Sequence, residues 1–205
     1  MMAVFRPLLR IRMTLPVFVV AAAVFSSQPA IAGDFDLGLK AFRAGDLDQA
    51  LKEWVPLAEA GDADAQHALG QMCEYGRGVA SDDQLAATWY RSAAYQGQSD
   101  AQYRLGVLHE HGWGVSRDAT MAAELYERAA QNGHAFAQHD LAFMYLNGTG
   151  RPQDRIQAYK WLRIASTQRA DLMEKHLKLV AESMSPAEIR AAEKLAAAWL
   201  NSQKV

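Results

Sequence analysis

Residues 65–97 read AQHALGQMCEYGRGVASDDQLAATWYRSAAYQG, and residues 101–133 repeat much of this order 36 positions further on. The dipeptide Ala-Gln occurs a third time at Ala137 and Gln138, after another step of 36 residues. Leucines, glycine pairs, aspartates and further alanines keep the same step: Leu69, Leu105, Leu141; Gly76/Gly78, Gly112/Gly114, Gly148/Gly150; Asp82, Asp118, Asp154; Ala86, Ala122, Ala158. A fixed period of this length is typical of an array of stacked repeats.

Each copy predicts two helices joined by a glycine turn. In the first copy, apolar and small residues follow helical spacing over residues 64–75 and again over 84–96. Gly76 favours a sharp turn because glycine readily adopts a positive φ. Asp82 or Asp83 stands where the second helix needs an N-cap acceptor. One helix pair is too small to bury its own apolar face, so we expect neighbouring copies to bury it jointly.

Two glycines fall inside the predicted first helices, where glycine is unfavourable. Gly70 and Gly106 hold the same position in successive copies, and the third copy has Ala142 there. Glycine inside a helix costs about 0.5–1 kcal/mol relative to alanine. A position that takes glycine or alanine therefore predicts a close helix–helix contact and not a ligand site.

The shared pattern resembles the Sel-1-like repeat, a helical repeat related to the tetratricopeptide repeat. It reads A-x-A-Q-x-x-L-G-x-M-Y-x-x-G-x-G-V-x-x-D-x-x-x-A-x-x-W-Y-x-x-A-A-x-x-G, and we assign three copies to residues 62–97, 98–133 and 134–169. The resemblance implies an all-α fold, an α-solenoid of stacked antiparallel helix pairs wound into a right-handed superhelix. It also implies a binding role without a cofactor, because members of the family generally act as adaptors.

The copies depart from the family pattern at three positions. Cys73 and His109 replace the tyrosine that the third copy keeps as Tyr145. We expect both residues to pack in the core, His109 with one hydrogen bond and Cys73 as an unreactive thiol. At each of the other two positions, one copy departs from the pattern. Arg151 replaces the valine that the other copies have as Val79 and Val115, and Leu125 replaces the tryptophan that they have as Trp89 and Trp161.

The regions on either side of the repeats read as caps, which brings the total to about five helix pairs. Residues 33–61 predict a shorter, degenerate pair that turns at Gly45, and Pro56 is expected to bend or shorten its second helix. Residues 170–205 predict the C-terminal capping helices. Ser185 stands before Pro186 as the N-cap of the last helix. Caps are expected because an open solenoid end exposes core.

Residues 1–32 have the order of a secretory signal peptide. Arg6, Arg10 and Arg12 precede the nearly apolar stretch 13–25, and the small residues around Ala32 suit a cleavage site before Gly33. The alternative is a membrane anchor. Thirteen helical residues reach roughly 20 Å, short of a hydrocarbon core of about 30 Å. We therefore predict a bacterial protein that is periplasmic or secreted, with no stable membrane span after cleavage.

Charge and cysteine content bear on the class of partner. Without the three arginines of the signal, the chain has 18 basic and 23 acidic residues, which gives a formal net charge of −5. This balance argues against a nucleic-acid partner, whose phosphates are bound by basic residues. Cys73 is the sole cysteine in the sequence, so the chain has no internal disulfide and depends on packing for stability.

The variable positions of the first helices form a stripe that we expect to line the concave side of a solenoid. Spacings of four, seven and eight residues place them on one helix face. They are His67, Gln71, Glu74 and Tyr75; Tyr103, Val107, Glu110 and His111; and His139, Phe143, Leu146 and Asn147. Unpacked aromatic residues are common anchors of protein interfaces. The stripe predicts a protein or peptide partner; alternatively, these are ordinary solvated residues.

The sequence offers weak grounds for metal binding or catalysis. His109 and His111 are two residues apart and point to different sides of a helix, and no His-Glu-x-x-His motif or cysteine pair is present. No serine lies in a Gly-x-Ser-x-Gly motif. Trp113, between two glycines at a loop tip, is a second kind of candidate contact, unless it folds back on the solenoid.

These observations favour a monomeric, non-catalytic interaction protein that holds a protein or peptide partner in its groove. Two alternatives stay open. One is a cell-wall-associated binder or hydrolase of muropeptides or β-lactams, although the chain lacks the cysteine pairs of the family members that suggest it. The other is a secreted effector directed at a host.

Overall fold

The computed structural model describes residues 33–203, except for the side chains of residues 170–172. The predicted signal segment, residues 1–32, lies outside the described residues. The described residues form ten helices and no strand: α1 (Phe35–Ala44), α2 (Leu47–Glu59), α3 (Ala63–Tyr75), α4 (Asp83–Tyr95), α5 (Ser99–His111), α6 (Ala119–Gln131), α7 (Ala135–Asn147), α8 (Arg155–Ser166), α9 (Ala170–Glu182) and α10 (Pro186–Ser202).

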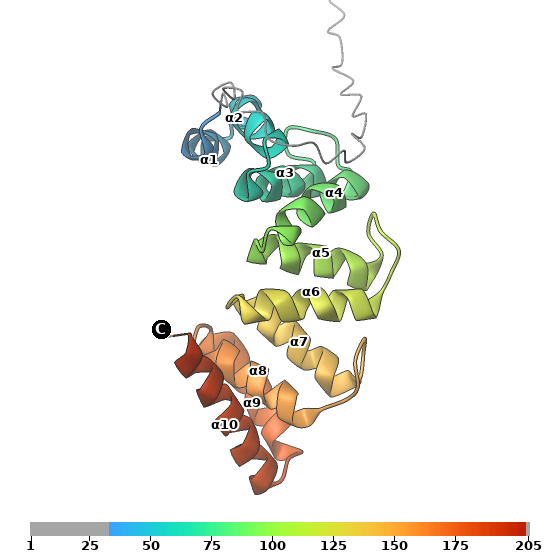
Figure 1. Ribbon diagram of the computed structural model, residues 1–205, viewed down its shortest axis with the longest axis vertical. Helices are drawn as coiled ribbons and strands as arrows, with labels where there is room; N and C mark the ends of the chain where they lie inside the picture. The colour runs from blue at the N-terminus through green and yellow to red at the C-terminus, as the bar shows by residue number, and fades with distance from the viewer. Residues whose placement is uncertain (1–32, 204–205) are drawn as a thin grey trace, which may run out of the picture. The chain divides into compact units, whose positions relative to one another are not determined.

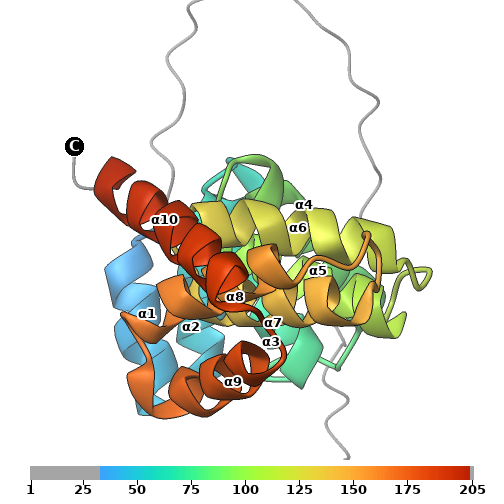
Figure 2. The ribbon, with the colours of Figure 1, turned by 90° about the horizontal axis from the view of Figure 1, so that it is seen from below.

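The helices stack in chain order, and each one from α1 to α8 packs against the next (Figure 1). The last helix departs from this order because α10 packs chiefly against α8 (Figure 2). Since α9 also packs against α8, the C-terminal cap is built on the last helix of the third repeat. The arrangement is an α-solenoid, as the repeat pattern predicted.

Local sequence accounts for the helix ends. Gly76 ends α3 in the left-handed conformation, with φ of 64°, and donates its N–H to the Met72 carbonyl. The carboxylate of Asp82 accepts a hydrogen bond of 3.0 Å from Leu85 N and so caps α4. The other two copies use the equivalent residues, Gly112 and Gly148 at the ends of α5 and α7, and Asp118 and Asp154 at the starts of α6 and α8.

The recurring glutamines join each repeat to the one before it. The glutamine side chain near the start of each first helix donates to a carbonyl near the end of the preceding helix. The pairs are Gln66 to Ala58 at 3.0 Å, Gln102 to Ala94 at 3.2 Å, and Gln138 to Ala130 at 3.1 Å. All three glutamines are buried, so these bonds satisfy helix-end carbonyls that water cannot reach.

The predicted close contact at the glycine position is confirmed. A Cβ atom on Gly70 would lie 2.6 Å from the Tyr90 ring, and one on Gly106 would lie 2.6 Å from the Tyr126 ring. The tyrosines belong to the second helix of the same repeat. In the third copy, Ala142 stands at this position and the tyrosine is replaced by Leu162. Glycine on the first helix is thus paired with tyrosine on the second, and alanine on the first helix is paired with the smaller leucine on the second.

The two caps agree with the sequence except at Pro56. This proline was expected to bend or shorten its helix; it does not shorten it, because α2 continues past it to Glu59 and keeps the 13-residue length of α3. Proline removes one backbone donor, and the buried Trp54 and Ala58 on either side hold the segment against its neighbours. At the other end, Ser185 is the N-cap of α10 as predicted, and it forms a capping box with Glu188.

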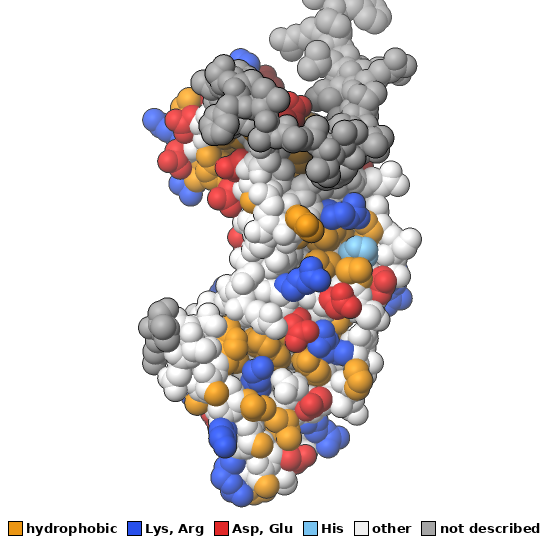
Figure 3. Space-filling view, in the orientation of Figure 1, with side chains coloured by type: hydrophobic (Ala, Val, Ile, Leu, Met, Phe, Trp, Pro, Cys, Tyr) orange, Lys and Arg blue, Asp and Glu red, His pale blue; other side chains and the backbone are white. Residues whose placement is uncertain are grey.

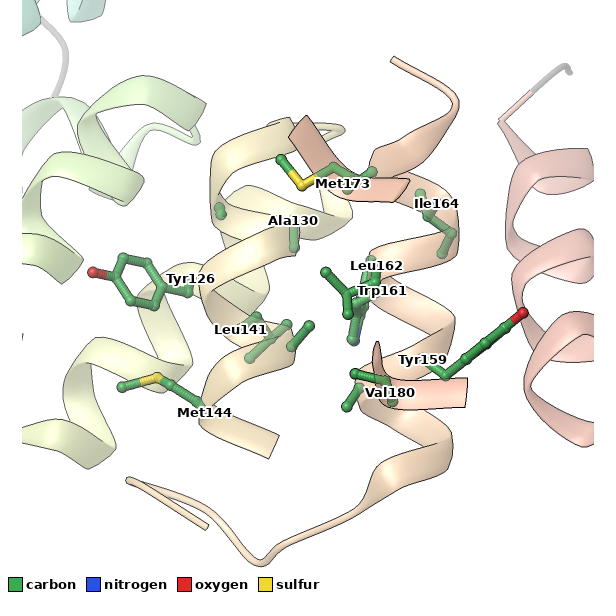
Figure 4. Close-up of a cluster of buried hydrophobic side chains, with 14 of the residues drawn as sticks. Tyr126, Ala130, Leu141, Met144, Tyr159, Trp161, Leu162, Ile164, Met173 and Val180 are labelled. Atoms are coloured by element: carbon green, nitrogen blue, oxygen red, sulfur yellow. The ribbon is translucent and has the colours of Figure 1, made fainter. Parts of the chain in front are cut away.

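Buried side chains form three clusters along the described part of the stack. Figure 3 shows basic and acidic side chains interspersed on the surface of one face. The largest cluster lies in the C-terminal half, where Leu141 of α7, Trp161 and Leu162 of α8, and Val180 of α9 pack together (Figure 4). The Trp161 ring also lies 5.9 Å from the Trp199 ring of α10. This core fixes α9 and α10 on the last repeat.

Candidate functional site

The candidate site is the surface on the variable side of α3, α5 and α7, called here the first-helix face. Three of the predicted residues are exposed, namely Tyr75, His111 and Asn147. The others are partly buried: His67, Gln71, Glu74, Tyr103, Val107, Glu110, His139, Phe143 and Leu146. Their partners inside the chain decide how much of each side chain is free for another molecule.

Glu74 is held by its own chain. Its carboxylate accepts a hydrogen bond of 2.6 Å from the Tyr90 hydroxyl, and it forms an ion pair with Arg104 of the next repeat. Arg104 also contacts the hydroxyl of Tyr75 and lies 5.3 Å from the centre of that ring. Glu110 repeats part of this arrangement and accepts a bond of 2.7 Å from Tyr126. Both acids therefore have a structural role on this face.

Tyr103 lies at the centre of an aromatic group that joins α5 to α7. Its ring stacks on His134 at 4.5 Å, and its hydroxyl donates to Asp140 at 3.1 Å. Burial, together with the negative charge of Asp140, raises the pKa of Tyr103. His134 in turn accepts from Ala137 N and caps α7, while its other ring nitrogen lies 3.2 Å from Asp100.

His139 connects the third repeat to the C-terminal cap. Its Nδ1 lies 2.8 Å from Asp140, and its Nε2 lies 3.1 Å from Nδ1 of His176 on α9. The ring of Phe143 lies 4.7 Å from His139 and meets His176 edge-on at 5.1 Å. Partial burial, then the neighbouring His139 and Lys175, lowers the pKa of His176. Sequence reasoning missed His176 because it lies outside the repeats.

His67 differs from its equivalents in the other copies. Its ring lies 5.8 Å from the Tyr90 ring, and its Nε2 atom is buried with no hydrogen-bond partner. Burial lowers the pKa of this histidine. A neutral imidazole is therefore favoured beside Tyr90 at neutral pH.

Trp113, the loop candidate, is 48% exposed. It lies between Gly112 and Gly114, and its ring stacks on His111 at 4.5 Å. The indole thus folds back on one predicted site residue while one side stays open to solvent. His111 and Trp113 form a single exposed aromatic surface next to the first-helix face.

Two cavities open on the first-helix face. The first, of about 380 Å³, lies where α1 meets α3 and is lined by Phe35, Leu39, Phe42, Trp54, Asp64, His67, Ala68, Gln71, Gln98 and Asp100. The second, of about 300 Å³, lies between α5 and α7 and is lined by Glu110, His111, Asp140, Phe143, Met144, Asn147 and Thr149. Six of the twelve predicted stripe residues line one cavity or the other.

The reactive groups that sequence reasoning considered lie in structural positions. Cys73 is 5% exposed, and burial raises the pKa of its thiol to about 11, so the unreactive thiol form dominates at neutral pH. His109 is partly buried, and its Nδ1 lies 3.3 Å from the Ser116 carbonyl. Within the part of the chain that the structure describes, no group of three His, Cys, Asp or Glu side chains has the arrangement of a metal site.

Comparison with known proteins settles the family. The Sel1 repeat model matches residues 63–98, 99–134 and 135–169, which together cover just over half of the chain. The chain belongs to the Sel1 repeat family. Proteins with this repeat generally serve as scaffolds for protein–protein interaction. A search among curated proteins found none that matches the chain.

Two solved structures resemble this Sel1 repeat chain. One is a Sel1 repeat protein from Oxalobacter formigenes, with 28% identity and a TM-score of 0.64 over 65% of this chain and 55% of that one. The other is a protective antigen present in uropathogenic Escherichia coli strains, which displays the SLR fold. It is 24% identical, with a TM-score of 0.58 over 82% of this chain and 44% of that one. The chain thus spans about half the length of these structures.

None of the helices in residues 33–203 combines the length and apolar character that a bilayer span requires.

Proposed function

We propose that this chain is a non-catalytic adaptor that binds a protein or peptide partner on its first-helix face. The observation that carries the proposal is the position of the two cavities. Each is lined by residues that vary between repeats, whereas the repeated residues Ala65, Ala101 and Ala137 are fully buried. The repeated alanines hold the stack together, whereas positions that differ between copies, such as Gln71 and Phe143, contribute to the lining of the two cavities.

The chemistry of this surface suits a peptide or protein. The Phe143 and Tyr103 rings are partly buried, so they offer apolar surface held in place by His176 and His134. Rings that are fixed before binding lose little conformational freedom on binding, which favours them as interface anchors. The Sel1 family's general use as an interaction scaffold supports the same proposal.

Affinity capture from an envelope fraction tests the adaptor function. The variant Tyr103→Ala/Phe143→Ala is expected to lose most of the captured partner, because interface anchors of this kind contribute about 2 kcal/mol or more each. Tyr75→Ala/Asn147→Ala removes exposed residues of the same face and is expected to weaken capture with little effect on folding. Partner amounts are measured by quantitative mass spectrometry, and thermal unfolding verifies that each variant is folded.

The matched control is Tyr95→Ala/Met121→Ala, which removes two large side chains that are 92% and 40% exposed on second helices. It is expected to capture the partner as well as the wild type does. Equal capture by all variants of the first-helix face would overturn the proposed function.

We further propose that the chain is exported and begins at Gly33 after cleavage. The support is the order of residues 1–32, with Arg6, Arg10 and Arg12 ahead of an apolar stretch and a small-residue site. Expression of the full chain with a C-terminal tag, followed by mass spectrometry of the protein from periplasm and medium, is expected to yield an N-terminus at Gly33. An intact N-terminus on membrane-bound protein would contradict export with cleavage.

A further inference from the structure

The two cavities of the first-helix face share one composition. In the cavity where α1 meets α3, Phe35 and Phe42 supply aromatic surface, and Asp64 and Asp100 supply carboxylates from two successive first helices. In the cavity between α5 and α7, Phe143 and Met144 supply the apolar surface. Glu110 and Asp140 again supply carboxylates from two successive first helices.

Acidic groups outnumber basic ones on this face. The carboxylates are those of Asp64, Glu74, Asp100, Glu110 and Asp140. Arg104 lies among them and is paired with Glu74, while Arg117 donates to the Glu110 carbonyl at 3.0 Å and Arg77 lies 5.8 Å from the centre of the Tyr75 ring. No Lys or Arg side chain lines either cavity.

A long cationic side chain matches both components of each cavity. The methylene groups of lysine or arginine pack along aromatic rings, while the charged end reaches polar groups. A guanidinium group binds carboxylates through short, charge-assisted hydrogen bonds. An anionic occupant would instead place a second negative charge beside these carboxylates, and a wholly apolar one would remove them from water without neutralising their charge, which is unfavourable in both cases.

The two cavities also lie along one line of the face. Gln71 lines the first cavity and Phe143 lines the second, and these residues hold the same position in copies one and three. One extended segment that runs across the first helices can therefore reach both cavities. We propose that the segment bound by the first-helix face is basic and places one arginine or lysine side chain in each cavity. This inference rests on the proposed function and adds the chemistry of the partner.

A defined peptide tests the basic character of the partner. The probe is a fluorescent Arg-Ser-Gly repeat peptide of about 15 residues, which spans roughly 50 Å when extended. Its control has citrulline, which is neutral and similar in shape, in place of every arginine. Fluorescence anisotropy with the purified chain is expected to show at least about tenfold tighter binding of the arginine peptide, equivalent to about 1.4 kcal/mol.

Charge-matched variants separate the cavities from the general acidity of the chain. Asp64→Asn/Asp100→Asn is expected to weaken binding of the arginine peptide about tenfold. Glu59→Gln/Glu124→Gln removes the same charge from exposed sites on second helices and is expected to change affinity less than about twofold, because exposed distant charges are screened. Asn147→Lys adds a cation at the edge of the second cavity without removing an internal contact and is also expected to weaken binding.

Equal binding of the arginine and citrulline peptides would overturn the basic-segment proposal, as would equal losses in the cavity variant and its control. Absence of binding by either peptide would overturn it as well. If capture of the partner still depends on Tyr103 and Phe143 in these cases, the adaptor function stands and the inferred partner chemistry alone falls.

Discussion

Gly114→Ala is expected to lower the free energy of unfolding by about 3 kcal/mol or more. Gly114 has φ of 64°, a conformation that costs a residue with a side chain about 1–2 kcal/mol. A Cβ atom there would also meet the Asp83 carbonyl and lie 2.5 Å from Gln84 N, at the start of α4 in the preceding repeat. Clashes in well-packed regions add about 1–3 kcal/mol, and backbone atoms cannot rotate away.

The matched control for this substitution is Gly133→Ala. Gly133 also has a positive φ, of 86°, but an added Cβ would meet nothing within 4 Å. We therefore expect Gly133→Ala to cost about 1–2 kcal/mol, the backbone term alone. Urea unfolding followed by circular dichroism measures both losses. Equal destabilisation of the two variants would show that the loop of one repeat does not press on the helix of the repeat before it.

Gly70→Ala is expected to cost about 2 kcal/mol, and Tyr90→Leu in the same chain is expected to recover part of that cost. The added methyl group would overlap the Tyr90 ring, which is fully buried. The third copy already combines Ala142 with Leu162 at these positions. A double-mutant cycle is expected to show a coupling energy of at least about 1 kcal/mol in favour of the double variant.

Urea unfolding of the wild type, both single variants and the double variant provides the four corners of this cycle. Tyr90→Leu alone also removes the hydrogen bond to Glu74, so the variant Tyr90→Phe serves as the control for the hydroxyl group. If the costs of Gly70→Ala and Tyr90→Leu simply add, the close contact does not constrain the choice of residue at this position.

The sequence predicted the helix ends well because local chemistry determines them. The end of α3 requires a residue that readily adopts a positive φ, which is Gly76, and the start of α4 requires an acceptor for a free amide, which is Asp82. Neither requirement depends on distant residues. The close approach at Gly70 could also be inferred, because the third copy accepts Ala142 there. The length of α2 was harder to predict, because tertiary packing around Trp54 carries the helix past Pro56.

The internal partners of the candidate site could not be predicted in the same way. Arg104 reaches Glu74 and His139 reaches His176 across neighbouring units, and the rotation between those units is set by packing. A signal was nevertheless available in the repeats. Tyr90 and Tyr126 occur in the copies that have Glu74 and Glu110, whereas the third copy replaces both residues of the pair with leucine, at 146 and 162. Such paired changes mark a contact.

Arg151 shows the same principle at a position that departed from the family pattern. It replaces the valine of the other copies, and its guanidinium donates to the Tyr145 hydroxyl at 2.8 Å and to Glu127 at 3.0 Å. Tyr145 itself stands where the first two copies have Cys73 and His109. The third copy thus combines the family tyrosine with an arginine in place of valine, and this pair fastens the third loop to α6.

The most direct test of binding through the first-helix face is the dissociation constant of the purified partner, once capture has identified it. We expect Tyr103→Ala/Phe143→Ala to weaken binding at least about 100-fold, equivalent to about 2.7 kcal/mol, while Tyr95→Ala/Met121→Ala changes it less than about twofold. Isothermal titration calorimetry with folded variants provides both values. An unchanged constant for Tyr103→Ala/Phe143→Ala, or a larger loss for the second-helix variant, would contradict binding through this face.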